Sequence, residues 1–289
     1  MYYQKIATAI LACALASTIL DASHRDWKTE AREPIHRTFT NDKSLDVDNV
    51  DGTIQIIGDN GNSIRVEGEK VIRAADQRAL DRARREVTLD VNEKGGVAQL
   101  YVNGPFRSNN HSGEDHGFHL HFDEHDYEVT YNFTIHLPRD TELRLRTVNG
   151  DVKTEQTNGK FDIHGVNGAV TMTATAGSGT AKTVNGRVEV SFRESPKSAS
   201  DFQSVNGVIE AAFPPNLSAD LRFKTLNGSA YTDFEATALA QQDAAASRRN
   251  NGKFVYASNR RSSVRVGSGG PELNFETLNG DIHIRKETR

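Results

Sequence analysis

The residues best suited to chemistry in this sequence are histidines between positions 111 and 125. Five of the chain's ten histidines fall there, interleaved with aspartates and glutamates: His111, His116, His119, His121 and His125. Neutral imidazoles and carboxylates are ligands of divalent metals. We therefore take His116, His119 and His121 as candidate metal ligands. No spacing among them matches a closed zinc motif, so an exposed, solvated loop is the favoured interpretation and a metal site the alternative.

The carboxylates offer a second possible chemistry, because parallel β-helices can carry carbohydrate-cleaving acids on one face. Here Asp151, Glu155, Asp162 and Glu189 alternate with lysines and arginines, which is typical of a solvated strand face. The sequence holds no phosphate-binding loop, no Gly-x-Ser-x-Gly motif and no His-Glu-x-x-His motif. We therefore expect a protein that is not an enzyme and that binds no cofactor, with a carbohydrate-active enzyme as the catalytic alternative.

The elements that would position these residues repeat along the chain. Val-Asn-Gly occurs at 148–150, 166–168, 184–186 and 205–207, and Leu-Asn-Gly at 226–228 and 278–280. The first three glycines are 18 residues apart, and those at 186, 207 and 228 are 21 apart. A fixed period near 20 is the signature of a repeat architecture. The predicted structural corners are Asn149, Gly150, Asn167, Gly168, Asn185, Gly186, Asn206, Gly207, Asn227, Gly228, Asn279 and Gly280.

Alternating apolar residues flank each corner, as in Leu143 and Leu145 before the first and Val152 after it. Such alternation predicts strands with one buried face, and Asn-Gly supplies positive φ for a sharp bend. Short hairpins in an antiparallel meander are one way to connect such strands. The recurring spacing instead favours an all-β, single-chain β-solenoid, β-helix-like, with Asn-Gly corners at 18–21-residue spacing. Parallel strands would then stack about 4.8 Å apart, and aligned Asn side chains could hydrogen-bond along the axis.

The repeat is regular only in the second half of the chain. Residues 23–142 read as N-terminal strands, one short helix near 74–86 and the His- and acid-rich loop, which together open the solenoid. Residues 143–289 read as the regular repeats, with an irregular excursion at 236–262. We expect residues 273–282 to close the chain with one more strand pair.

The N-terminus carries the pattern of a targeting segment. Lys5 precedes an apolar run from Ile6 to Leu20 that is short for a membrane span, so residues 1–22 are predicted to be a signal peptide. Lipoprotein anchoring through Cys13 is the weaker alternative, because the apolar run continues well past it. No second long apolar segment follows, so no transmembrane segment is expected in the mature chain. The net charge of −4 is mild and argues against a nucleic-acid partner.

Two runs carry a resemblance to a known family. Leu-Pro-Arg-Asp-Thr-Glu-Leu-Arg-Leu-Arg-Thr-Val-Asn-Gly at 137–150 and the segment at 267–282 resemble the bacterial putative-adhesin domain family of unknown function, which is related to the head domains of autotransporter-like adhesins. The resemblance implies a β-solenoid, export to the periplasm, cell surface or medium, and an adhesive or cell-envelope role. It implies no catalytic residues. The expected partner is an unknown protein or glycan at the cell envelope, and a structural spacer without a ligand is the alternative.

Overall fold

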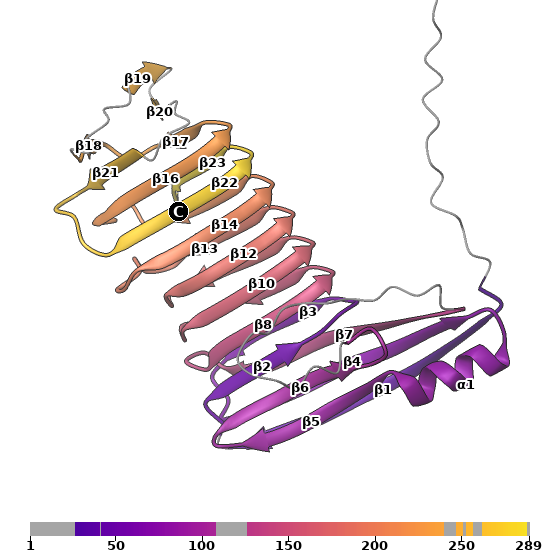
Figure 1. Cartoon of the computed structure of the whole chain (residues 1–289). Coiled ribbons are helices and arrows are strands. Elements are labelled where there is room, and N and C mark those ends of the chain that lie inside the picture. The colour runs from indigo at the N-terminus through magenta and orange to yellow at the C-terminus, as the bar shows by residue number, and fades with distance from the viewer. Residues whose placement is uncertain are drawn as a thin grey trace, which may run out of the picture.

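The computed structural model describes residues 27–40, 42–107, 126–239, 247–250, 253–256 and 262–287. Most of this part of the chain is β-strand, and α1 (Gln77–Glu86) is its one helix (Figure 1). The prediction of an all-β chain with a short helix near 74–86 is confirmed. The described helix is neither long nor apolar enough to cross a membrane.

The strands form two large mixed sheets that face one another. Sheet A contains, in spatial order, β1 (Thr29–Thr40), β4 (Ser63–Ala74), β7 (Tyr127–Pro138), β3 (Ile54–Asp59), β9 (Val152–Glu155), β11 (Val170–Thr175), β13 (Val188–Phe192), β15 (Ile209–Phe213), β23 (Ile282–Lys286), β17 (Ala230–Thr232), β20 (Lys253–Tyr256) and β19 (Ser247–Asn250). Sheet B contains β18 (Ala236–Ala238), β21 (Ser262–Val266), β16 (Ala219–Asn227), β22 (Glu272–Asn279), β14 (Ser200–Asn206), β12 (Gly179–Asn185), β10 (Phe161–Asn167), β8 (Glu142–Asn149), β2 (Ser44–Asp48), β6 (Val97–Asn103) and β5 (Thr88–Lys94).

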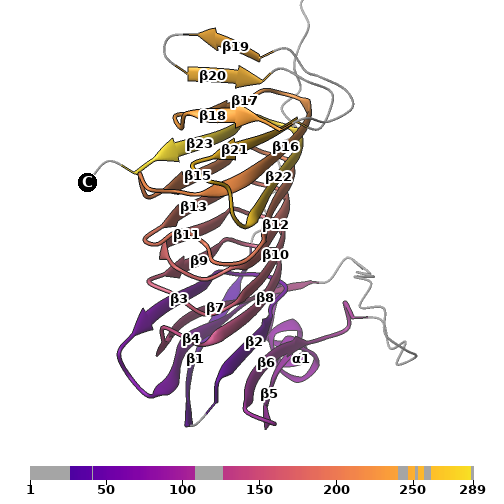
Figure 2. The same cartoon turned by 90° about the vertical axis from the view of Figure 1, so that its left-hand side faces the viewer.

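The middle of both sheets is parallel. A strand of sheet B passes through an Asn-Gly corner into a strand of sheet A, and we call such a pair a rung; successive rungs lie on one another (Figure 2). Val170 pairs with Val152 on one side and with Val188 on the other, and all three side chains are buried. The predicted parallel pairing is therefore confirmed over these rungs, and the antiparallel meander is wrong.

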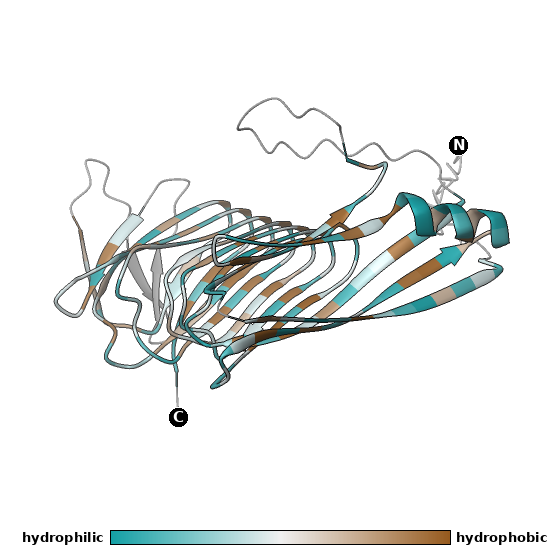
Figure 3. Cartoon of the chain, turned by 90° about the horizontal axis from the view of Figure 1, so that it is seen from below, coloured by the Kyte–Doolittle hydropathy of each residue, from teal (hydrophilic) through white to brown (hydrophobic). Residues whose placement is uncertain are grey.

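The core lies between the two sheets. Alternate residues of each strand point inward, so apolar and polar residues alternate along the strands (Figure 3). Because paired strands are in register, like side chains stack on like: Phe275 lies between Phe202 and Phe223, with ring centroids 5.2 and 5.9 Å away. Burial of each such ring stabilises the fold by roughly 1.5–3 kcal/mol.

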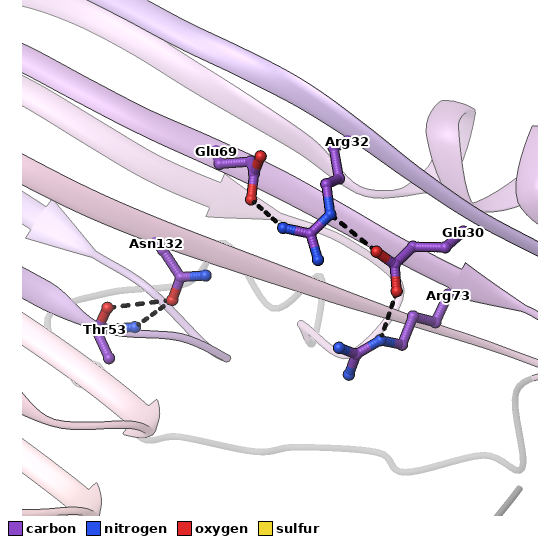
Figure 4. Close-up of polar contacts among 6 residues, drawn as sticks. All are labelled: Glu30, Arg32, Thr53, Glu69, Arg73 and Asn132. Atoms are coloured by element: carbon purple, nitrogen blue, oxygen red, sulfur yellow. Dashed lines mark hydrogen bonds and ion pairs between the residues drawn. The ribbon is translucent and has the colours of Figure 1, made fainter.

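The N-terminal end is antiparallel. Strand β4 pairs with β1 and β7, and α1 packs against these strands through Ala79, Leu80 and Ala83. The helix begins at Asp76, whose carboxylate accepts a hydrogen bond from the backbone N–H of Ala79, as helix N-caps do. The outer face of β1 and β4 carries exposed ion pairs among Glu30, Arg32, Glu69 and Arg73, and Asn132 accepts two hydrogen bonds from Thr53 (Figure 4). Arg73 and Arg32 lower the pKa of Glu30.

The C-terminal end departs from sequence order. Strands β22 and β23 do not close the stack but lie between the rung β14–β15 and the rung β16–β17. Strands β21 and β22 flank β16 on opposite sides, and the connection 267–271 crosses the start of β16. There Ser218 donates a hydrogen bond to Gly269 O (2.7 Å) and accepts one from the backbone N–H of Ser268 (3.1 Å). The expected last rung is present as β22 and β23, but the contacts of Ser218, which we call the clasp, hold it inside the stack and not at its end.

The predicted irregular excursion at 236–262 contains strands in its described parts. β18 and β21 pair antiparallel to each other, and β21 also pairs antiparallel to β16 at the end of sheet B. β20 pairs antiparallel to β17 and to β19 in sheet A. These strands cover β16 and β17, which would otherwise present unpaired backbone groups.

Candidate functional site

The predicted corner residues gather at one edge of the molecule. Each corner Asn is the last residue of its sheet B strand, and the chain turns through the following Gly into sheet A. The corners thus form a line along the stacking direction, which we call the corner edge. Its order from the N-terminal side is 149, 167, 185, 206, 279 and 227.

The asparagine side chains form a continuous hydrogen-bonded ladder. Each Nδ2 donates to the Oδ1 of the preceding corner, and the ladder starts at Asp51, which occupies the equivalent place before β3. Burial raises the pKa of the Asp51 carboxyl, and the hydrogen bond from Asn149 opposes that shift. The donor–acceptor distances are 2.6 Å for Asn149 to Asp51, 2.8 Å for Asn167 to Asn149, 2.9 Å for Asn185 to Asn167, 2.8 Å for Asn206 to Asn185, 2.7 Å for Asn279 to Asn206 and 2.7 Å for Asn227 to Asn279.

Glycine is needed at the corners mainly because neighbouring corners lie very close together, and less because of the backbone φ. Positive φ was expected at every corner, but only Gly150, Gly168 and Gly280 have it, at 141°, 152° and 159°. All six share a different feature, since a Cβ at each would lie within 2.2 Å of the carbonyl oxygen of the glycine in the preceding corner. Gly207 is the tightest, at 1.9 Å from Gly186 O. The expectation of positive φ is therefore wrong for Gly186, Gly207 and Gly228. Glycine is needed there because the stacked corners leave no room for a side chain.

A row of buried hydroxyls supports the same edge, and sequence reasoning did not identify it. Two residues before the Asn, Thr183 donates to Gly168 O (2.8 Å) and Ser204 to Gly186 O (2.8 Å). Thr277 and Thr225 make equivalent bonds to Gly207 O and Gly280 O, at 2.9 and 3.0 Å. The signal was present, because a Thr or Ser precedes five of the six corner Asn residues by two positions. These bonds hold each corner on the one before it.

The same edge exposes a column of aliphatic side chains. Val184, Val205, Leu278 and Leu226 precede the Asn on four neighbouring strands and are 37%, 38%, 42% and 49% exposed. Within the described residues, they are the large hydrophobic side chains that are exposed. The adjacent Asn side chains are exposed too. We define the corner strip as this aliphatic column together with Asn185, Asn206, Asn279 and Asn227.

Three of the four carboxylates considered for catalysis have other partners, and Glu155 is exposed on the outer face of β9. Asp162 lies 2.9 Å from His164 and 3.9 Å from Arg144, and Glu189 lies 3.6 Å from Arg187. The Asp151 carboxylate accepts a hydrogen bond from the backbone N–H of Ala169 (2.9 Å) and so joins neighbouring corners. These residues build the surface and the corners of the stack.

One half-buried carboxyl lies on the outer face of sheet B. Burial raises the pKa of Asp46, and Arg146 and Arg144 oppose this shift from 3.6 and 3.7 Å. A carboxyl between two guanidinium groups is a structural ion-pair network, and its shifted pKa alone does not make a catalytic acid.

The opposite edge of the stack carries a groove of about 550 Å³. Asn158 is one of its lining residues; its side chain donates a hydrogen bond to Asp140 (3.0 Å) and accepts one from Arg193 (2.6 Å). The lining of the groove carries both positive side chains (lysines) and negative ones (aspartate and glutamate). The groove is lined by Asp140, Asn158, Lys160, Glu194, Lys197 and the segment 176–179.

The candidate metal ligands His116, His119 and His121 lie outside the described residues, as do Cys13 and the predicted signal peptide. Among the residues that are described, no group of three or more His, Cys, Asp and Glu side chains is placed to hold a metal ion. The histidine loop therefore stays a prediction.

Comparison with known proteins gives distant similarities. No protein-family profile and no curated protein matches the chain. Among solved structures, a putative cell adhesion protein from Clostridium sporogenes is 8% identical, with a TM-score of 0.40, over 90% of this chain and 100% of that one. A putative adhesin from Bacteroides fragilis is 12% identical, with a TM-score of 0.37, over 90% and 98%. A putative lipid binding protein from Parabacteroides distasonis is 11% identical, with a TM-score of 0.30, over 90% and 98%. These similarities are too remote to assign the chain to a family.

Proposed function

We propose that this chain is an exported, non-enzymatic, adhesin-like β-solenoid that attaches to a protein or glycan of the cell envelope through the corner strip. The observation that carries the proposal is the column of Val184, Val205, Leu278 and Leu226, exposed side by side on four adjacent strands next to a row of exposed amides. Contiguous exposed apolar side chains bordered by polar ones are typical of interaction sites.

The solenoid part of the proposal is supported by the rungs. Each rung passes once along sheet B and once along sheet A, with the Asn-Gly corner between, and the register is kept from one rung to the next. We propose residues 1–22 as a signal peptide, 23–142 as the opening part and 143–289 as the regular solenoid.

The energetics favour a binding role for the strip. Complete burial of a Val or Leu side chain is worth roughly 1.5–3 kcal/mol, and these four are between a third and a half exposed. Covering them would therefore contribute on the order of 1 kcal/mol each. The exposed part of these side chains is not buried on folding, so a partner that covers it would gain this free energy.

The proposal is tested with the purified chain lacking residues 1–22, labelled fluorescently and titrated onto intact cells of the producing strain. The strip variant changes Val184, Val205, Leu278 and Leu226 to Ser. The matched control, the face variant, changes four residues of the outer face of sheet A to Ser: Lys153, Glu155, Thr173 and Arg285.

We expect the strip variant to bind cells at least ten-fold more weakly than the unmodified chain and the face variant to bind normally. The face variant should keep the midpoint of thermal unfolding within a few degrees, because its residues are exposed. The strip variant should lose roughly 1 kcal/mol of stability per residue, because more than half of each side chain is already buried. Binding is therefore measured at a temperature where circular dichroism shows both variants folded. Equal binding by the two variants would contradict the proposal that the corner strip is the binding surface. No binding by any of them would favour a spacer without a ligand.

A further inference from the structure

We infer that the corner strip binds a neutral, linear glycan that lies along the stacking direction. This inference rests on the proposed function and names the partner of that same site. It follows from the hydrogen-bonding capacity, the apolar contact and the charge of the strip, taken in turn.

The side-chain amides of the ladder use only half of their hydrogen-bonding capacity within the ladder. A side-chain amide carries two N–H donors and an oxygen with two lone pairs. Asn206 donates once to Asn185 and accepts once from Asn279, and Asn185 and Asn279 are used in the same way. Each of these rungs therefore keeps one N–H and one lone pair for a ligand. A sugar hydroxyl, which donates and accepts at once, matches this pair of groups.

The aliphatic column lies directly beside these amides. From Val184 to Leu226 it crosses four neighbouring strands, about 14 Å at three strand spacings of about 4.8 Å. A glycan chain presents C–H faces between its hydroxyls, so the same molecule can cover the aliphatic column and bond to the amides. The regular repeat of the strip favours a ligand that is itself a linear repeat.

Other classes of partner fit the strip less well. An added peptide strand needs an open sheet edge, but the backbone is already paired here: Gly207 N–H donates to Asn279 O (3.0 Å) and Gly280 N–H to Asn227 O (3.1 Å). A stable protein interface buries about 800 Å² on each partner, and the strip is only two side chains wide.

The charge of the strip disfavours three further classes of partner. Nucleic acids are bound mainly by Lys and Arg side chains that neutralise phosphates, and all eight side chains of the strip are uncharged. Of the cations beside the strip, Lys224 is paired with Glu276 and Arg187 with Glu189, and Lys182 is half-buried. The same reason disfavours an anionic membrane surface and an acidic polysaccharide, so a neutral glycan remains.

The direct test is calorimetric titration with two neutral hexasaccharides, cellohexaose and mannohexaose, and with polygalacturonate as a charged comparison. The chain lacking residues 1–22 is compared with the strip variant and with an amide variant, Asn206→Ala with Asn279→Ala. A groove variant, Lys160→Ala with Lys197→Ala, tests whether sugars bind at the opposite edge. Thermal unfolding of every variant verifies that it is folded.

We expect at least one neutral hexasaccharide to bind, with affinity ten-fold weaker or lost in the strip and amide variants and unchanged in the groove variant. Failure of both neutral probes, tighter binding of polygalacturonate, or loss in the groove variant alone would overturn the inference.

Treatment of the cells separates this inference from the proposed function. Periodate cleaves the vicinal diols of glycans, and protease removes surface proteins. Strip-dependent binding that survives protease and is lost after periodate supports a glycan. Strip-dependent binding that survives periodate and is lost after protease leaves the function standing and overturns the glycan. Binding that does not depend on the strip overturns the proposed function itself.

Discussion

Replacement of Gly207 by Ala tests the reasoning about the corners most directly. Gly207 is outside the left-handed φ range, so Ala brings no backbone strain there, only a Cβ placed 1.9 Å from Gly186 O. Real Cβ atoms are essentially never closer than 3.0 Å, so the two corners must separate by at least 1.1 Å (3.0 minus 1.9). That is enough to break every hydrogen bond between them.

The magnitude follows from the bonds that span this gap. Asn206 Nδ2 to Asn185 Oδ1 (2.8 Å), Ser204 Oγ to Gly186 O (2.8 Å) and Gly186 N–H to Asn206 O (3.2 Å) all join the two corners. At about 1 kcal/mol each, their loss destabilises the fold by about 3 kcal/mol. Gly96→Ala is the matched control, since its φ is 78° and nothing lies within 4 Å of a Cβ there. It should cost only about 1–2 kcal/mol of backbone strain.

The measurement is urea unfolding of both variants and the unmodified chain, followed by far-UV circular dichroism and analysed at a common m-value. We expect a clearly lower midpoint for Gly207→Ala than for Gly96→Ala. If Gly96→Ala is the more destabilised, backbone conformation rather than close approach decides where glycine is needed, and our account of the corner edge is refuted.

Three further outcomes are expected. Ser218→Ala removes the clasp over β16 and should destabilise by about 1 kcal/mol; equal urea midpoints would contradict the role of the clasp. Asp51→Asn should raise the thermal midpoint near neutral pH, because burial raises the pKa of Asp51 and the ionised carboxylate is disfavoured in the folded state. The gain should shrink as the pH falls through the raised pKa towards 3.8, where the native carboxyl takes up its proton, and a gain that grows at low pH would contradict this sign. Calorimetric titration of zinc should show binding weaker than about 1 mM, unchanged when His116, His119 and His121 become Ala; micromolar binding lost in that variant would make the loop a metal site.

Local sequence was enough to predict the strand type and its register. An apolar alternation broken by Asn-Gly every 18 residues places like residues at equal distances along successive rungs. Phe161, for example, then has to lie opposite Leu143 and Gly179, as it does. The physical reason is that one rung is one repeat, so register is set by the chain between two neighbouring corners.

The order of the rungs was not predictable in this way. β14, β22 and β16 share one pattern: an inward Phe, then a buried hydroxyl, then an Asn that is followed by Gly. Each of them could therefore lie against either of the others. Only the tertiary structure places β22 between them, because β21 pairs with β16 and its five-residue connection to β22 is held at Ser218. The pairing of Asp51 with Asn149 is equally non-local, since 98 residues separate them.

The candidate site shows the same division. The same motif, Val-Asn-Gly, occurs at the first and third corners, yet Val148 is 2% exposed and Val184 is 37% exposed. Sequence determined that an apolar residue precedes each corner. Tertiary structure decided which of these residues are covered: the chain before β3 pairs with the first corner, where Val50 O accepts a hydrogen bond from the Val148 N–H (3.2 Å), whereas Val184, Val205, Leu278 and Leu226 remain exposed at theirs.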